Sequence, residues 1–294
     1  MTGPIVPRRR LAEELKRLRG QDGRSLEEIA QSLLISTSKL SRLENGQGSP
    51  QARDVRDLIR AYGVDEALGS RMMRWVTQAR RQGWWSDYEF TPGGFTSGLD
   101  VHVAYESEAS VERAYTMPFF PALLQTEAYV RALYRSLEPW RGNDEVDELI
   151  RLRKRRQELL GTPEGRPPLD LVVVCHESAL RQVVGDKQIL HDQLRAIDAA
   201  FDRDNVELRI LPFDTSPPFT STCMYTYFEF ADSLDRDVVH IETHAGYRLL
   251  ETTESLQQYR RYFDELLRRS LSVRKSRDLI RSRIRELDRI SEAP

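Results

Sequence analysis

The sequence predicts a multidomain protein in which an all-α domain precedes an α+β domain with about four strands. Three observations predict this fold class. Apolar residues recur at helical spacing through residue 82, and valine-rich or alternating segments typical of strands begin after residue 168. The length of 294 residues is enough for two sizeable cores. We expect the all-α domain at 1–65, a linker helix at 66–90 and the α+β domain at 91–294.

Residues 25–46 contain two helix starts separated by a short turn. Ser25 and Glu28 have the spacing of a capping box, so a helix is expected to begin there. Ser36 is the expected N-cap of a second helix. The apolar residues of each helix fall on one face, namely Leu26, Ile29, Ala30 and Leu33 in the first and Leu40 and Leu43 in the second. This is the pattern of a helix-turn-helix motif, whose second helix enters the major groove of DNA.

The outward face of the second helix carries hydrogen-bonding side chains of the size that reaches base edges and phosphates. We expect Arg42 to pair with a guanine edge and Lys39 with a guanine or a phosphate. Glu44 is expected to be an internal partner of an arginine in the preceding helix. The predicted DNA contacts are Ser25, Ser36, Thr37, Ser38, Lys39, Ser41, Arg42, Asn45 and Ser49. Capped amphipathic helix pairs also occur in proteins that bind no DNA, and this alternative stays open at this point.

Further helices are expected on both sides of this pair. Leucines on one face of residues 8–19 suit a preceding helix. Ser49 and Pro50 are expected to cap and start a following helix, with proline at its first position. Another apolar stripe predicts a helix over 65–82, which ends before Trp84 and Trp85.

The balance of charge differs between the two predicted domains. Residues 1–60 hold 12 basic and 8 acidic side chains, whereas the remainder holds 32 basic and 38 acidic ones. A mildly basic N-terminal domain can still bind DNA by concentrating positive charge on one face, and the acidic remainder argues against a second nucleic-acid surface. No apolar run resembles a signal peptide or a membrane span. We therefore expect a cytoplasmic protein with Cys175 and Cys223 reduced and buried in strands.

The α+β domain is predicted from four strand-like segments and several helical ones. The strands are expected at 169–175, 206–210, 223–230 and 238–243. The helices are expected at 126–136, 145–160, 177–184, 188–201, 254–269 and 273–290. Residues 101–111 mix aromatic and acidic side chains, and the sequence leaves open whether they form a helix or a strand.

A set of mostly aromatic residues in and before the α+β domain is a candidate surface for a ligand or a partner. The set consists of Trp84, Trp85, Gln125, Phe219, Tyr225 and Tyr227. A ligand pocket, a hydrophobic core and a groove for a partner protein would use the same residue types, so the sequence leaves these three interpretations open. For the two tryptophans, anchoring the linker to the next domain is the preferred interpretation.

Little in the sequence indicates catalysis. His240, Glu242 and His244 would share one face of a strand, which could bring two imidazoles and a carboxylate together around a metal. A polar strand face is the preferred interpretation, because no further ligand motif supports the metal site. No nucleophile elbow, P-loop or dinucleotide fingerprint is present. We expect no enzyme activity, no catalytic residue, no metal and no cofactor.

The segment Ser38-Lys39-Leu40-Ser41-Arg42-Leu43-Glu44-Asn45-Gly46 resembles the recognition-helix signature of the XRE, or lambda-repressor-like, helix-turn-helix family. Two positions depart from the pattern of that family. Leu26 replaces a glutamine that touches backbone phosphate in many members, which puts that contact in doubt. Leu34 replaces the usual glycine of the turn, so the turn either avoids a positive φ or tolerates some strain.

The rest of the chain resembles the C-terminal domain, of uncharacterised function, in a large actinobacterial regulator family. The resemblance rests on Gly83-Trp84-Trp85-Ser86-Asp87-Tyr88, Leu123-Leu124-Gln125-Thr126-Glu127-Ala128-Tyr129, Ile210-Leu211-Pro212-Phe213 and Phe228-Glu229-Phe230, with Ala122 where the family often has glycine. It implies a sequence-specific transcriptional regulator that works with a small protein partner encoded nearby. The helix-turn-helix class implies a homodimer on a pseudo-palindromic DNA operator. The alternative is an antitoxin-like interaction protein that sequesters its partner and autoregulates its own operon.

Overall fold

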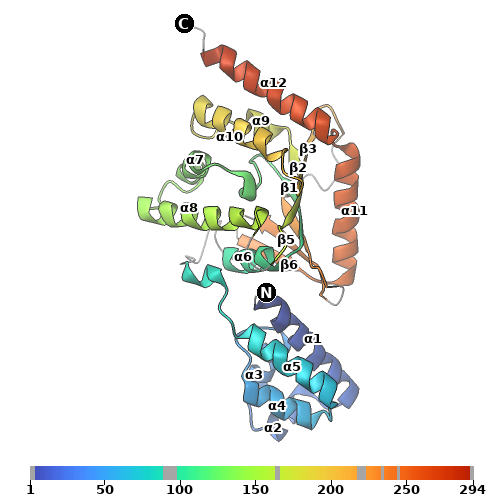
Figure 1. The fold of residues 1–294 in the computed structure, drawn as a ribbon. Helices are drawn as coiled ribbons and strands as arrows, with labels where there is room; N and C mark the ends of the chain where they lie inside the picture. Colours follow the sequence, from blue (N-terminus) through green and yellow to red (C-terminus); the bar gives the residue numbers. More distant parts are fainter. Residues whose placement is uncertain are drawn as a thin grey trace. The chain divides into compact units, whose positions relative to one another are not determined.

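The computed structural model describes residues 4–88, 98–162, 166–216, 223–232, 235–243 and 246–291. The chain divides into two compact units (Figure 1). The helical unit comprises Met1–Ser86 and the short segment Asp232–Asp235, and the α+β unit comprises Asp87–Ala231 and Arg236–Pro294. No helix in the described ranges has both the length and the apolar character required to cross a membrane.

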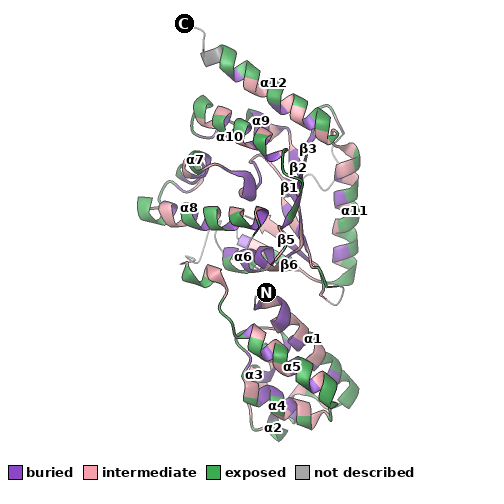
Figure 2. Cartoon of the chain, viewed as in Figure 1, coloured by how far each residue is buried: buried purple, intermediate pink, exposed green. Residues whose placement is uncertain are grey.

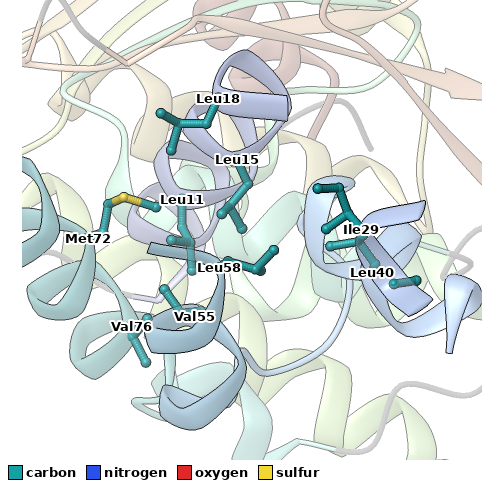
Figure 3. Close-up of a cluster of buried hydrophobic side chains, with 10 residues drawn as sticks. Leu11, Leu15, Leu18, Ile29, Leu40, Val55, Leu58, Met72 and Val76 are labelled. Carbon is teal, nitrogen blue, oxygen red and sulfur yellow. The ribbon is translucent and has the colours of Figure 1, made fainter. Parts of the chain in front are cut away.

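The first part of the chain is helical throughout its described elements. These are α1 (Ile5–Asp22), α2 (Leu26–Ser32), α3 (Thr37–Glu44), α4 (Ala52–Ala61), α5 (Glu66–Ala79) and the 3-10 helix η1 (Trp84–Asp87). Their apolar faces meet in one core, where Leu11, Leu15, Ile29, Leu40 and Leu58 are fully buried (Figure 3). The predicted all-α domain is confirmed.

Helix α5 belongs to this same core. It packs against α1 and α4, and its residues Met72 and Val76 are buried in the cluster that Figure 3 shows. The segment expected to be a linker helix therefore buries its apolar stripe within the helical unit. The reason is that a stripe as apolar as that of α5 is stabilised by leaving water, and the nearest complementary surface is that of α1 and α4.

The two helix starts of the helix-turn-helix pair have the capping interactions that the sequence predicts. The hydroxyl of Ser25 accepts a hydrogen bond from the backbone N–H of Glu28, and the carboxylate of Glu28 accepts one from the N–H of Ser25. The hydroxyl of Ser36 accepts from the N–H of Lys39 at 3.2 Å. Each cap satisfies a donor that the first turn of a helix leaves without an intrahelical partner.

The start expected for α4 is wrong. Ser49 and Pro50 do not begin the helix, which starts at Ala52 with Gln51 as its N-cap. Gln51 has extended backbone angles (φ −87°, ψ 128°), and Gly48 before it has a φ of +74°. The loop therefore runs further than the Ser-Pro signal suggests, and Pro50 is a buried loop residue.

The turn between α2 and α3 keeps a left-handed residue although it has no glycine there. Leu34 has a φ of +55°, and among the described residues no other non-glycine residue has a positive φ. Its side chain is 94 % exposed. The turn therefore does not avoid a positive φ at Leu34 but tolerates the strain of one.

The α+β unit is built on a six-stranded mixed sheet with the order β3-β2-β1-β4-β5-β6. Strands β1, β2 and β3 are parallel to one another, and the pairs β1–β4, β4–β5 and β5–β6 are antiparallel. The strands are β1 (Val111–Thr116), β2 (Asp170–His176), β3 (Val206–Leu211), β4 (Tyr225–Glu229), β5 (Val238–Thr243) and β6 (Gly246–Leu250). The helices are α6 (Leu99–Glu108), η3 (Ala122–Leu124), α7 (Glu127–Leu137), α8 (Asn143–Gln157), η4 (Glu158–Leu160), α9 (Ser178–Arg181), α10 (Lys187–Ala200), α11 (Thr253–Arg269) and α12 (Val273–Ser291).

The predicted α+β class is confirmed, but the expected count of about four strands is too low. The sequence leaves the segment before β1 open, and the structure divides it into α6 and the start of β1. The sequence of β1 does not alternate between apolar and polar residues, because the buried side of the strand includes Glu112. Strand β6 is a short edge strand with little burial, so it gives a weak pattern.

The sheet lies between two helical layers (Figures 1 and 2), and alternate residues of each strand face opposite layers. On one face, Tyr115, Tyr225, Tyr227 and Val239 pack with Phe263 and its neighbours on α11. The other face of β1 and β5 carries Glu112, Ala114 and His240, which lie under α6, α7 and α8. This second face therefore has polar residues at positions that a simple core would fill with apolar ones.

Two smaller expectations need correction. The helix expected at 177–184 is limited to α9, because Gln182 already has extended backbone angles. Cys175 is buried in β2, and burial raises the pKa of its thiol to about 12. Cys223 lies before β4 rather than within it and is only half-buried.

Candidate nucleic-acid interface and ligand cavity

The outward side of α3 is a continuous polar surface. Ser38 and Arg42 are exposed, and Thr37 and Ser41 are half-buried beside them. These four residues and Leu26 of α2 line one shallow hollow. Arg42 has no ion-pair partner among the described residues, so its guanidinium is available to a phosphate or to a base edge.

Lys39 makes an ion pair inside the helical unit. Its Nζ lies 2.7 Å from Oδ2 of Asp54, a largely buried carboxylate on α4. The pair connects α3 to α4 and leaves the side chain of Lys39 43 % exposed. The contact of Lys39 with a guanine or a phosphate stays a prediction.

The other predicted DNA contacts lie at the ends of α2 and α3. The side chains of Ser25 and Ser36 are used as helix caps. Asn45 is exposed and its amide lies 3.4 Å from the hydroxyl of Ser41. Ser49 is exposed in the loop before α4. The DNA contacts of these four residues stay predictions.

Glu44 has the internal role that the sequence predicts. Its two carboxylate oxygens accept hydrogen bonds from Nε and Nη2 of Arg19 at 2.8 and 2.9 Å. The glutamate is buried on α3, and Arg19 is near the end of α1. This bidentate pair holds α3 against α1 and fixes which side of α3 faces outward.

A cavity of about 120 Å³ lies in the α+β unit between the sheet and the helices α6, α7 and α8. Strands β1 and β5 contribute Glu112, Ala114, Thr116, His240 and Glu242 to its floor. These residues share one face because alternate residues of a strand point the same way. Aromatic side chains form much of the remaining wall, namely His102, Phe119, Phe120, Tyr134 and Tyr247.

One side of the cavity is held by a buried ion pair. Arg156 of α8 donates from Nε and Nη2 to the two carboxylate oxygens of Glu106 on α6, both at 2.7 Å. Nε2 of His102 lies 3.2 Å from Nη2 of the same arginine. Burial alone would raise the pKa of Glu106, but the charge and the hydrogen bonds of Arg156 lower it to about 2.

Burial shifts the pKa of three further groups of the cavity, Glu112, Glu242 and His240, toward their uncharged forms. Burial raises the pKa of Glu112 well above its usual range, and the nearby charge of Glu106 adds to this effect. Burial likewise raises the pKa of Glu242. Burial lowers the pKa of His240 to about 2, with a contribution from His102.

Several polar atoms of the cavity lack a hydrogen-bond partner within the described part of the chain. They are Oε2 of Glu112, Oγ1 of Thr116, Oε1 of Gln125, Nδ1 of His102 and both ring nitrogens of His240. Glu112, Gln125 and His240 are only 5, 6 and 2 % exposed. Buried polar atoms in native proteins are usually satisfied, so this concentration in one cavity is unusual.

Comparisons with known proteins assign both parts of the chain. Residues 10–71 match a helix-turn-helix domain family. Residues 99–282, more than half of the chain, match a domain of unknown function, DUF5753. The chain belongs to the DUF5753 family. Searches of the curated proteins and of the solved structures gave no match. The helix-turn-helix match indicates that this DUF5753 member is a DNA-binding regulator.

The structure separates the residues expected to form one ligand or partner surface. Gln125 lines the cavity of this DUF5753 member. The rings of Tyr225 and Tyr227 lie on the opposite face of the sheet with Phe263 of α11, and the hydroxyl of Tyr227 donates to Asp237 at 2.9 Å. Trp84 and Trp85 pack edge to face in the helical unit, and Phe219 lies outside the described residues.

The polar floor of the cavity is the feature that sequence reasoning missed. Glu112, Glu106 and Arg156 are ionisable residues at buried positions. The available signal was an acidic residue inside an otherwise apolar stretch, as with Glu106 after Val103 and Tyr105. Of the metal interpretation, His240 and Glu242 do share a strand face, and His244 lies outside the described residues. Within the described ranges, no group of three or more potential ligands could hold a metal.

Proposed function

We propose that this DUF5753 member is a sequence-specific transcriptional regulator that reads DNA with α3 and carries its effector function in the α+β unit. The observation that carries the proposal is the polar outward side of α3, where Ser38, Ser41 and Arg42 line one hollow with the start of α2. The side chains on this surface supply hydrogen-bond donors and acceptors, and Arg42 supplies a cation without an internal partner in the described chain.

The mode of binding follows from how α3 is held. Two ion pairs support the helix from behind, Arg19–Glu44 toward α1 and Lys39–Asp54 toward α4. A recognition helix needs such support because a base contact depends on a fixed position relative to the groove. Arg42 would then read a guanine, and Ser25 and Ser49 would position the phosphate backbone.

A homodimer is part of the proposal. One helix-turn-helix unit contacts only one half-site, and regulators of this class reach operator specificity by binding two half-sites about one helical turn apart. We therefore expect a pseudo-palindromic operator. The effector that the α+β unit senses would be a small molecule or a small protein, and the cavity favours a small molecule.

The test is a selection of binding sites from random duplex DNA with the full chain, followed by fluorescence anisotropy on the enriched sequence. Arg42→Ala should lose most of its preference for the enriched duplex over a scrambled one, by roughly 5- to 150-fold. Arg74→Ala is the matched control, because it removes the same charge from an exposed position of α5. It should keep the preference.

Three outcomes would contradict parts of the proposal. No enriched motif would mean that the chain alone does not read sequence. Equal specificity of Arg42→Ala and wild type would remove α3 from base recognition. An enriched motif without two-fold symmetry, together with a monomer in analytical ultracentrifugation of the complex, would remove the dimer.

A further inference from the structure

We infer that the cavity between the sheet and α6, α7 and α8 binds an uncharged, planar, single-ring molecule that carries both hydrogen-bond donors and acceptors. The inference goes beyond the proposed DNA binding and does not depend on it, because the cavity lies wholly within the α+β unit. The unpartnered polar atoms of its floor carry the argument.

The polar atoms need a partner because they are buried. Removing a donor or acceptor from water without replacing its hydrogen bond is unfavourable. Oε2 of Glu112, Oε1 of Gln125 and the ring nitrogens of His240 come from three separate elements and line the same cavity. A set of unsatisfied groups that converges on one space is the arrangement of a preformed polar binding site.

The size of the cavity limits the ligand to one ring. Its volume is about 120 Å³. An engineered apolar cavity of about 150 Å³ holds benzene. A single six-membered ring of about the size of benzene therefore fits this volume, whereas a fused bicyclic ring system or a peptide side chain with its backbone is too large.

The shape of the wall favours a planar ligand. Phe120 and Tyr134 approach from the helical side, and Tyr247 approaches from β6. His102 lies among these aromatic rings, 4.9 Å from the ring of Tyr247 and 5.2 Å from that of Phe228. Flat faces of this kind bind a flat molecule by stacking or by edge-to-face contact.

The electrostatics disfavour a charged ligand. Burial raises the pKa of Glu112 and of Glu242, so the cavity disfavours a negative charge on its own groups. Burial lowers the pKa of His240, so a positive charge is disfavoured as well. Arg156 is already neutralised by Glu106. Arg153 lies on the wall but is only half-buried, so water reaches its guanidinium. An ion entering this space would lose its hydration without gaining a buried counter-charge.

The polar groups offer both kinds of hydrogen bond. Neutral His240 has one donor and one acceptor nitrogen, and the side chain of Glu112 shares a hydrogen bond with Glu106, which leaves its Oε2 as an acceptor. Gln125 offers only its oxygen, because its Nε2 donates to the carbonyl of Phe120 at 2.6 Å. The hydroxyl of Thr116 acts in either direction. A ligand that satisfies the floor therefore needs donors and acceptors on its rim.

Ligand-observed saturation-transfer NMR on the full chain tests the inference with four single-ring probes. Uracil is uncharged and has hydrogen-bond donors and acceptors, and phenol has one hydroxyl group. Benzene has no polar group, and benzoate carries a negative charge. In titrations, we expect uracil and phenol to bind more tightly than benzene, and benzoate to bind most weakly. Arg42→Ala should bind the probes like wild type, which separates this site from DNA recognition.

Two variants locate the binding. Ala114→Leu fills the cavity from its floor and should weaken uracil at least 10-fold, whereas Ala199→Leu adds the same atoms at an exposed position of α10 and should not. Thr116→Val keeps the side-chain shape and removes only the hydroxyl, so it should weaken uracil roughly 2- to 10-fold and leave benzene unchanged. If thermal unfolding shows that Ala114→Leu does not fold, Thr116→Val decides the question alone.

Three results would overturn the inference. Absence of transfer from all four probes at millimolar concentration would mean that the cavity binds no single ring. Binding of benzoate at least as tight as that of phenol would contradict the uncharged class. Equal binding of benzene and uracil, unaffected by Thr116→Val, would mean that the floor does not recognise polar groups.

Discussion

The helical unit and the α+β unit each contain a bidentate arginine–glutamate pair, and the two pairs differ in how much water reaches them. In the helical unit, Arg19 and Glu44 are 27 and 3 % exposed. In the α+β unit, Arg156 and Glu106 are 3 and 0 % exposed. The hydrogen-bond distances are similar, from 2.7 to 2.9 Å.

The difference shows that the same chemistry serves two purposes. The Arg19–Glu44 pair has one member at the surface, so it orients α3 without placing an isolated charge in the interior. The Arg156–Glu106 pair lies in the low-dielectric interior, where each charge is tolerated only because the other is present. Around it, burial shifts the pKa of Glu112 and of His240 toward the neutral form of each. The pair of the helical unit thus keeps its arginine in contact with water, whereas the pair of the α+β unit is enclosed on both sides.

The largest expected effect comes from breaking the buried pair. Arg156→Met leaves the carboxylate of Glu106 without its counter-charge, and we expect the α+β unit to lose about 3–5 kcal/mol of unfolding free energy. Urea unfolding measures the loss. The double variant Arg156→Met with Glu106→Leu should recover most of it, because no unpaired charge remains. If the double variant is as unstable as the single one, packing of the arginine rather than its charge would be responsible.

The pH dependence of stability gives the next largest effect. The pKa of His240 is about 2 in the folded chain and 6.5 in the unfolded chain. Between pH 4.5 and 6.5 the unfolded chain therefore binds a proton that the folded chain does not, so stability falls as the pH falls, by up to about 1.4 kcal/mol per pH unit. His240→Phe removes this contribution.

The measurement is the difference in unfolding free energy between wild type and His240→Phe, from urea titrations at several pH values. His102, Glu112, Glu242 and the Arg156–Glu106 pair are common to both proteins, so their own titrations largely cancel. Wild type should lose stability relative to the variant as the pH is lowered. His191→Phe, on α10 away from the cavity, is the matched control. Parallel curves for wild type and His240→Phe would mean that His240 is protonated in the folded chain.

The pair in the helical unit should be weaker than the buried one. Arg19→Met is expected to cost about 1–2 kcal/mol, because Glu44 loses a bidentate partner but lies at a position that water can approach through the space left by Arg19. Urea unfolding compares it directly with Arg156→Met, the same substitution in the other unit. Equal losses of unfolding free energy in Arg19→Met and Arg156→Met would contradict the difference between the two pairs. They would mean that Glu44 is as isolated from water as Glu106.

The smallest effect concerns the strained turn before α3. Leu34→Gly should stabilise the helical unit by roughly 0.5 kcal/mol, since glycine adopts a positive φ without the steric cost, while its larger unfolded-state entropy offsets part of the gain. The exposed side chain contributes no burial that would be lost. Leu34→Ala removes the same side chain but keeps Cβ, and should give no gain. A destabilised Leu34→Gly would contradict the assignment of strain.

The sequence by itself determined the features that depend on residues close together along the chain. The capping box of Ser25 and Glu28 and the cap at Ser36 join residues three apart. Because these contacts form within one helical turn, the residue types and their spacing specify them. The outward side of α3 and the internal role of Glu44 follow from the same periodicity.

The tertiary structure alone decided the cavity and its polar floor. Glu106 and Arg156 are 50 residues apart, and they meet only when α6 and α8 pack on the same face of the sheet. From the sequence, Glu112 in β1 would be expected to face solvent. It is buried because α6, α7 and α8 pack on that face of the sheet. A local pattern gives the period of a strand but not which of its two faces is covered. Which polar groups are enclosed therefore depends on long-range packing, and so does the ligand class that we infer.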